Sequence, residues 1–402
     1  MLHNFKVKNN KLFIGGISAE SLVKKYGSSL YIYDAEIIKR QYKALVDNII
    51  YPKLKIHYAC KTNSNLEIIK LLKTFGAVIE TVSIGEVDLA LKAGFKPSEI
   101  LYTSGNISFE EQKEVMEKNV LMNLDSLTQI KRFGEIRPGG KISFRINQGI
   151  GAGWHAHTIT GGPESKFGID ISQLREVLQL TKKYNLKIVG IHQHIGSNIL
   201  DENIFMKAIN KLLETAKQFS DLEFIDLGGG FGMPYKPGEK SLDMQSLGNK
   251  ITNALNKFTK EYGRELIMRF EPGRFLVAES GVLLANVTEI KKTPHKIFVG
   301  LNAGFNQLIR PAMYGAYHEI INASSVEGSK EVVSVVGNIC ESADFFARDR
   351  EITKFAEGDV AAILDSGAYG YAMSSTFNAR LQPAEVLVID KTSRLIRKEM
   401  GV

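Results

Sequence analysis

Eight short runs rich in β-branched residues, separated by helical patterns, constrain the fold of this chain more than any other feature. The intervening stretches, such as residues 66–74, 85–93 and 204–218, carry apolar residues at helical spacing. Alternation of this kind predicts a parallel sheet, which is either closed into a (β/α)8 barrel or open and doubly wound. The eight runs are residues 54–59, 78–82, 100–103, 120–124, 141–146, 188–193, 223–227 and 266–270.

Polar and glycine residues at the ends of these runs favour the closed barrel. Lys61 follows the first run, His194 ends the sixth, Gly228 follows the seventh and Glu271 follows the eighth. A barrel gathers the carboxyl ends of all its strands onto one face, whereas an open sheet separates the first strand from the last. We therefore predict an α/β fold with a TIM-like barrel.

The pattern changes after about residue 280 to short strand-like runs with weak helical periodicity, which predicts a C-terminal all-β domain. We expect the early runs 11–15 and 30–33 to pair with it. The predicted domains are a barrel at residues 35–280 and a β-domain at 281–402 together with 1–34. The later runs are residues 282–288, 296–299, 332–336, 359–364 and 385–388.

The composition excludes several protein classes. No run of about 18 apolar residues is present, so we expect no transmembrane helix and no membrane partner. The first residues lack the apolar core of a signal peptide, and two cysteines cannot build a disulfide framework, so we expect a cytoplasmic protein. The net charge of +7 is spread along helical segments and not gathered with aromatics, so we expect no nucleic-acid partner.

Lys61 is the first candidate for chemistry. It follows the apolar run that ends in Tyr58-Ala59-Cys60, which delivers its amine to the mouth of the predicted barrel. An amine held partly neutral in such a place forms a Schiff base with an aldehyde cofactor. Taken alone, a lysine at a strand end is more often a solvated surface residue.

A glycine-rich segment, Gly228-Gly229-Gly230-Phe231-Gly232, follows the seventh run. Glycines let backbone N–H groups approach and bind a phosphate, and a phosphate site after the seventh strand recurs in barrels. A dinucleotide fingerprint fails because Met233 stands at the last required glycine, and a Walker lysine is absent. A plain tight turn is the alternative interpretation.

The eighth run leads into Glu271-Pro272-Gly273-Arg274. Pro272 and Gly273 turn the chain, so that Glu271 is expected just inside the barrel mouth. A carboxylate at that place can face the nitrogen of a pyridine ring and keep it protonated. The alternative is a structural salt bridge between Glu271 and Arg274.

Paired histidines raise the question of a metal site. His192 and His194 share one face of a strand, and His155 and His157 repeat the spacing. We expect no metal, because no third acidic or thiol ligand lies at metal spacing. Stacking of His194 on a flat cofactor suits the strand end better, Ser197 is placed to donate to a phosphate, and His192 is expected in the core.

The β-domain supplies further candidates. Cys340 and Glu341 end a strand-like run, where a thiol can return a proton to a carbanion and a carboxylate can hold an ammonium group. Arg310 and Tyr314 together can grip a carboxylate. For each pair, ordinary packing is the alternative.

These segments, in this order, resemble the diaminopimelate decarboxylases, which are pyridoxal-phosphate enzymes with an alanine-racemase-like barrel and a C-terminal β-domain. The resemblance runs from about Tyr26 to Leu387 and rests on five separated motifs. It implies pyridoxal 5′-phosphate as cofactor and decarboxylation of meso-2,6-diaminopimelate at its D-centre to L-lysine, the last step of lysine biosynthesis. It also implies a homodimer with shared active sites, in which the Cys340–Glu341 segment reaches the neighbouring subunit.

The resemblance also implies roles for single residues. Lys61 resembles the Schiff-base lysine, His194 the ring that stacks on the cofactor and Cys340 the proton donor, which are the three catalytic candidates. The implied cofactor-binding set is Lys61, His194, Ser197, Gly230, Glu271, Pro272, Gly273, Arg274 and Tyr369. The implied substrate-binding set is Arg274, Arg310, Tyr314, Glu341 and Tyr369.

The chain departs from the family pattern at two positions. Glu80 stands where aspartate is usual, and Asn302 stands where aspartate commonly precedes Ala-Gly, which bears on substrate preference. The alternatives are a related decarboxylase acting on D-lysine, D-ornithine or carboxynorspermidine, and a non-catalytic pyridoxal-phosphate-binding regulatory protein. An alanine racemase is disfavoured because its pyridine nitrogen faces an arginine.

Overall fold

The computed structural model describes residues 4–401, which form two compact units. The barrel unit comprises Tyr42–Met233 and Lys240–Phe275. The β unit comprises the described residues of Met1–Gln41, Pro234–Glu239 and Leu276–Val402. Helix α2 (Ala35–Val46) runs from one unit into the other.

The barrel unit is built on eight parallel strands that pair in chain order. Strand β13 pairs back onto β5, with Phe270 opposite Ile56, and β8 pairs with β9, so the sheet closes. The eight strands are β5 (Leu54–Ala59), β6 (Val78–Thr81), β7 (Ile100–Ser104), β8 (Leu121–Leu124), β9 (Lys141–Asn147), β11 (Lys187–His192), β12 (Phe224–Asp226) and β13 (Ile267–Phe270). The predicted barrel is confirmed, because an open sheet leaves its first and last strands unpaired.

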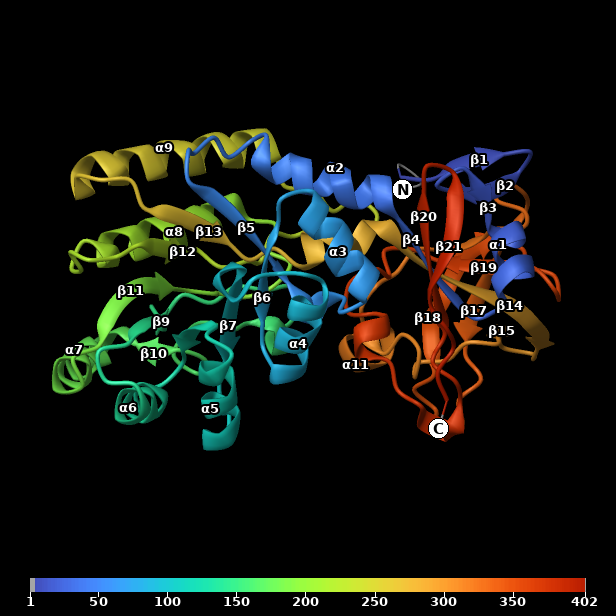
Figure 1. Cartoon of the computed structure of the whole chain (residues 1–402). Helices are drawn as coiled ribbons and strands as arrows, with labels where there is room; N and C mark the ends of the chain where they lie inside the picture. Colours follow the sequence, from blue (N-terminus) through green and yellow to red (C-terminus); the bar gives the residue numbers. More distant parts are fainter. Residues whose placement is uncertain (1–3, 402) are drawn as a thin grey trace. The chain divides into compact units, whose positions relative to one another are not determined.

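Helices surround these strands (Figure 1). Most of them begin after a residue whose side chain accepts a hydrogen bond from a backbone N–H of the first turn: Asn65, Ser83, Ser108, Ser126, Asp201 and Asp243. The helices are α3 (Leu66–Thr74), α4 (Ile84–Lys92), α5 (Phe109–Glu117), α6 (Leu127–Ile136), α7 (Leu174–Lys183), α8 (Glu202–Ala216) and α9 (Met244–Tyr262). A short strand, β10 (Ile169–Asp170), adds to β9, and helix α10 (Arg274–Val277) follows β13.

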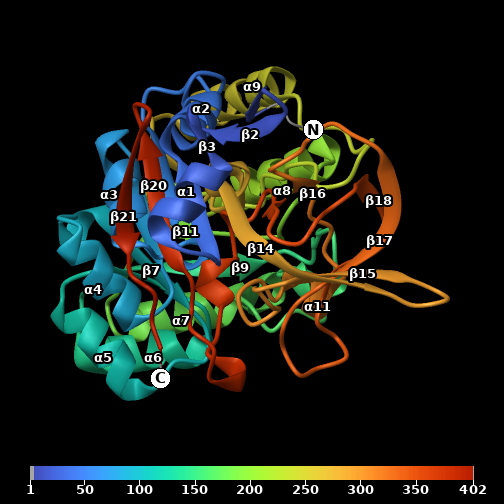
Figure 2. The same cartoon turned by 90° about the vertical axis from the view of Figure 1, so that its right-hand side faces the viewer.

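The β unit contains one large sheet in the order β18-β17-β15-β14-β4-β20-β21, with β19 on β14 and β16 on β19 (Figure 2). The unit also contains a three-stranded sheet and the helices α1 (Ala19–Tyr26) and α11 (Arg310–Tyr314). The strands are β1 (Lys6–Lys8), β2 (Lys11–Ile14), β3 (Ile17–Ser18), β4 (Leu30–Asp34), β14 (Gly281–Lys292), β15 (Ile297–Leu301), β16 (Ile320–Asn322), β17 (Lys330–Val336), β18 (Phe345–Thr353), β19 (Val360–Ile363), β20 (Ala384–Ile389) and β21 (Thr392–Arg397).

The two early runs behave differently. The run 30–33 is strand β4 between β14 and β20, so its predicted pairing is confirmed. The run 11–15 is strand β2, whose ladders are with β1 and β3 and not with the large sheet, while its Leu12 N–H donates to the Ala323 carbonyl oxygen of the β unit at 3.0 Å. Left-handed residues at Asn9-Asn10 and Gly15-Gly16 close two tight hairpins and make local pairing easy.

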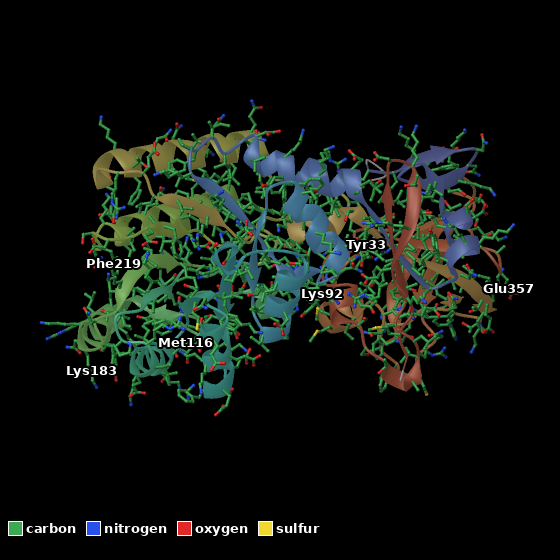
Figure 3. The ribbon with its side chains drawn as sticks, viewed as in Figure 1. Tyr33, Lys92, Met116, Lys183, Phe219 and Glu357 are labelled. Atoms are coloured by element: carbon green, nitrogen blue, oxygen red, sulfur yellow. The ribbon has the colours of Figure 1, made fainter. Side chains whose placement is uncertain are left out.

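Large side chains fill each unit separately (Figure 3). In the barrel unit, Phe219 packs edge-on against Phe144 of β9, with ring centroids 5.9 Å apart. In the β unit, Tyr33 of β4 donates to Glu385 Oε1 at 2.6 Å, and Arg397 reaches the other oxygen of this carboxylate at 2.6 Å. These contacts pair a carboxylate that is fully buried in the sheet. Among residues 4–401, no helix is long and apolar enough to cross a membrane.

Candidate active site

Lys61 lies where β5 ends, in a short turn of 3-10 helix (Cys60–Thr62). Its Nζ donates to Glu80 Oε2 at 2.9 Å, and Glu80 is fully buried on the neighbouring strand β6. Burial raises the pKa of Glu80, and the charge of Lys61 opposes this shift. Lys61 itself is half-buried, so the pair holds a reachable amine beside an enclosed carboxylate.

Glu271, directly after β13, lies in a buried group with His192 of β11 and Asp226 of β12. His192 Nε2 is 2.9 Å from Glu271 Oε2. Burial lowers the pKa of His192 to about 4, so the ring is neutral, and one hydrogen bond joins its Nε2 to Glu271 Oε2. Burial raises the pKa of Glu271 to about 7, and burial together with the charge of Glu271 raises the pKa of Asp226 to about 7.

The glycine segment and the turn after β13 form a second feature of the barrel unit. Arg274 donates to Ser197 Oγ from Nε at 3.3 Å and from Nη2 at 3.0 Å. Gly230 has a φ of +102°, and a Cβ there would lie 2.7 Å from the Gly196 carbonyl oxygen. This close backbone approach, at a left-handed φ, requires glycine.

His194 is hydrogen-bonded to the glycine segment. Its Nδ1 accepts a hydrogen bond from the Gly229 N–H at 3.1 Å. Burial and the nearby charges of Arg145 and Lys61 hold the pKa of His194 well below its usual value, so the ring is neutral. A neutral ring fixed through one nitrogen is suited to stacking on a flat cofactor.

The group around Glu271 fits a pyridine nitrogen. Within the part of the chain that the structure describes, the buried atoms Glu271 Oε1 and Asp226 Oδ2 have no N–H donor, and the two carboxyl groups interact with each other. A protonated ring nitrogen would supply an N–H donor to Glu271. Together with the amine of Lys61 and the Ser197–Arg274 contact, the residues present fit pyridoxal phosphate.

The buried group of His192, Asp226 and Glu271 tests the prediction that no metal is bound. Ligand atoms of His192, Asp226 and Glu271 lie within 4.8 Å of one another, a spacing that a metal ion can use. The spacing of the histidine pairs does not predict this set, because Asp226 and Glu271 are far from His192 in the sequence. The charges of Lys61 and Arg145 act on Glu271, and such cations disfavour a divalent ion at this place.

Five predicted site residues belong to the β unit. Arg310 and Tyr314 are the first and last residues of α11, and the Arg310 side chain is buried. Cys340 and Glu341 are exposed in the segment between β17 and β18, where the Cys340 N–H donates to Asn378 Oδ1 at 2.9 Å. Tyr369 has a left-handed backbone, with a φ of +56°. Their predicted roles remain predictions, as do the roles in the barrel unit.

Sequence reasoning brought together Lys61, His194, Ser197, Gly230 and Arg274, which all lie in the barrel unit with Glu271. It missed Asp226, placed His192 only in the core and treated Glu80 only as a departure from the family. An acid inside an otherwise apolar run was the available signal for both Glu80 and Asp226.

Known proteins resemble this chain over most of its length. Residues 35–278 match the family model of the pyridoxal-dependent decarboxylases, pyridoxal-binding domain. Diaminopimelate decarboxylase of Methanothermobacter thermautotrophicus is 43% identical over 96% of this chain and 92% of that protein. The enzyme of the same name from Aquifex aeolicus is 37% identical over 97% of this chain and 94% of its own length.

The chain belongs to the diaminopimelate decarboxylase family. The crystal structure of the M. jannaschii family member superimposes with a TM-score of 0.91 at 34% identity and covers 99% of this chain and 95% of that one. The Helicobacter pylori family member, solved in complex with L-lysine, gives a TM-score of 0.87 at 35% identity, covering 94% and 96%. Membership of this family makes pyridoxal phosphate the cofactor.

Proposed function

We propose that this chain removes the D-centre carboxylate of meso-2,6-diaminopimelate and releases CO2 and L-lysine. The observation that carries the proposal is the grouping in one barrel of the Lys61–Glu80 pair, the buried Glu271 beside His192, and the Ser197–Arg274 contact. Relatives at 34–43% identity bear the name of this activity. The decarboxylation completes lysine biosynthesis.

We assign the cofactor contacts to the barrel unit, except for one contact from Tyr369 of the β unit. The amine of Lys61 would hold the cofactor, and the ring of His194 would stack on it. Ser197, Gly230, Gly273 and Arg274 would bind the phosphate. Glu271, held by its hydrogen bond with His192 Nε2, would keep a proton at the ring nitrogen, while Pro272 fixes the turn.

The residues of the chain divide the reaction between them. Pyridoxal phosphate, when bound, accepts the electron pair that remains on Cα after the bond to the carboxylate breaks. The Cys340 thiol then supplies the proton that forms the new C–H bond. The electron pair thus ends in this bond, and CO2 is the leaving group.

The distal L-centre of the substrate survives because the chain only binds it. Arg274 and Arg310 bind its carboxylate, Glu341 binds its ammonium group, and Tyr314 adds a further contact. D-lysine and D-ornithine lack a distal carboxylate for this pair of arginines, so they are the poorer fit. A lysine/ornithine decarboxylase from Vibrio vulnificus is similar at only 22% identity, with a TM-score of 0.80, which reflects the shared fold.

We further propose that the protein works in the cytoplasm as a homodimer with shared active sites. Residues 35–280 form the cofactor-binding domain, and residues 281–402 with 1–34 form the domain that carries substrate and dimer contacts. Exposure of Cys340 and Glu341 on the β unit supports a role for them at a neighbouring subunit.

A substrate panel tests the function. Purified protein with added pyridoxal phosphate is incubated with meso-diaminopimelate, D-lysine, D-ornithine or carboxynorspermidine, and CO2 is measured. We expect rapid release from meso-diaminopimelate alone. Turnover of another substrate with diaminopimelate inert overturns the assignment, and absorbance of bound cofactor without any CO2 supports a non-catalytic binding protein.

A further inference from the structure

Arg310 is a buried guanidinium at the start of a short helix. Only 1% of its surface is exposed, and Pro311 follows it in α11. A buried guanidinium is costly unless its N–H groups find acceptors, and their directions are fixed by its planar shape. Its Nη1 donates to His318 Nε2 at 2.8 Å, so His318 is one group that determines how Arg310 is held.

The backbone fixes the tautomer of His318. Its Nδ1 lies 2.8 Å from the carbonyl oxygen of Leu364, which can only accept. The proton of the imidazole therefore sits on Nδ1, and Nε2 presents its lone pair to Arg310. His318 is fully buried, and Arg350 donates from its Nη1 to the His318 carbonyl oxygen, which anchors the residue at a second point.

An aromatic ring completes the support. The Arg310 guanidinium carbon lies 4.6 Å from the centroid of the Tyr235 ring, and this ring meets His318 edge-on with centroids 5.5 Å apart. Tyr235 comes from Pro234–Glu239, the segment that interrupts the sequence of the barrel unit and belongs to the β unit. The plane of the guanidinium is thus held by an acceptor and by a ring face.

A neutral hydrogen-bond acceptor and a carboxylate have different effects on the charge of a guanidinium. A carboxylate placed at His318 would form a bidentate pair and neutralise the positive charge. A neutral imidazole fixes the direction of the guanidinium and brings no negative charge of its own. Asp365, whose charge also interacts with Arg310, has its pKa raised to about 7 by burial and so carries a reduced negative charge near neutral pH.

We propose that His318 is a positioning residue that sets substrate specificity: it orients Arg310 toward the distal carboxylate of the amino-acid substrate without neutralising it. The inference rests on the proposed function, in which Arg310 binds this carboxylate. His318 does not touch the substrate. It nevertheless contributes to the discrimination against substrates that lack the distal carboxylate.

Two substitutions separate the hydrogen bonds of His318. His318→Asn keeps a donor at the position of Nδ1 for Leu364 but removes the acceptor for Arg310. His318→Gln places an acceptor near the position of Nε2 for Arg310 and removes the donor to Leu364. Both variants are studied as holoenzymes, with cofactor absorbance and melting temperature measured first.

The diagnostic ligands are L-lysine, which retains the distal carboxylate, and cadaverine, which lacks it. We expect His318→Asn to weaken inhibition by L-lysine and to raise KM for meso-diaminopimelate by roughly tenfold to a hundredfold, the range for a hydrogen bond to a charged group. Inhibition by cadaverine should stay within about twofold, since it makes no use of Arg310. His318→Gln should retain most of the affinity for L-lysine.

Equal loss of L-lysine and cadaverine inhibition in His318→Asn would overturn the inference, because it would indicate a general structural role. Unchanged L-lysine inhibition would also overturn it. If the unmodified enzyme releases no CO2 from meso-diaminopimelate, the proposed function fails instead, and the two failures are distinguished by this first measurement. If both variants fail to fold, Tyr235→Leu, which removes the ring face under Arg310, must show the same selective loss of L-lysine inhibition, and its absence would overturn the inference.

Discussion

Glu271→Gln should make the cofactor-free protein less sensitive to alkaline pH. Burial is the largest cause that raises the pKa of Glu271, from its ordinary 4.5 to about 7. In the folded protein the carboxyl group therefore keeps its proton through a pH range in which the unfolded chain has already released it. Glutamine mimics the protonated form and has no charge to bury.

The magnitude follows from the size of this shift. A change of about 2.5 pKa units corresponds to about 3 kcal/mol, at 1.36 kcal/mol per unit. The cost to the wild-type protein is absent below about pH 4.5, where both states are protonated, and it grows until about pH 7, where it levels off. Between these limits, the free energy of unfolding of Glu271→Gln should gain about 3 kcal/mol relative to wild type.

Urea denaturation of the cofactor-free proteins at pH 5 and pH 8 measures this difference. Glu357→Gln is the matched control, since Glu357 is exposed on the β unit (Figure 3). Asp226 reinforces the effect, because the charge of Glu271 contributes to its raised pKa. Parallel pH dependence of wild type and Glu271→Gln would refute the account of a buried, partly protonated carboxyl group.

Three further substitutions test the proposed roles. Lys61→Ala should abolish CO2 release and the visible absorbance of the bound cofactor, and retention of that absorbance would contradict the role of its amine. Gly230→Ala should weaken cofactor affinity at least about tenfold, because its Cβ would lie 2.7 Å from the Gly196 carbonyl oxygen. Gly238→Ala is the control and should leave the affinity unchanged, since Gly238 also has a positive φ, of +85°, but nothing lies within 4 Å of the added Cβ. Cys340→Ser should lower kcat by about tenfold to a thousandfold with unchanged cofactor absorbance, and an unaltered kcat would assign the proton to another donor.

The barrel was predictable because its signals are local. Each strand carries its own β-branched run, and most helices carry their own periodicity and cap. The ends of the eight predicted strands therefore agree with the structure to within one residue. Strand β18 was missed because Arg348, Asp349 and Arg350 interrupt its alternation, and it is specified mainly by its pairing with β17. Strand β2 shows that turn chemistry can override an expected distant pairing.

The candidate site was predictable where a functional residue stands at the end of a strand. Lys61 and Glu271 can be identified from their positions at strand ends, because the carboxyl ends of barrel strands meet on one face. Glu80 and Asp226 lie within strands, and their importance depends on which side chains lie beside them in space. His318 carries no sequence signal at all, since its effect requires the contact with Arg310.

The proposed reaction is tested most directly by labelling the carboxylate that should leave as CO2. meso-Diaminopimelate labelled with ¹³C in the carboxylate of its D-centre is incubated with the holoenzyme, and both products are analysed by mass spectrometry and chiral chromatography. The account predicts labelled CO2 and unlabelled L-lysine. Label retained in the lysine, D-lysine as the product, or no release of CO2 would contradict it.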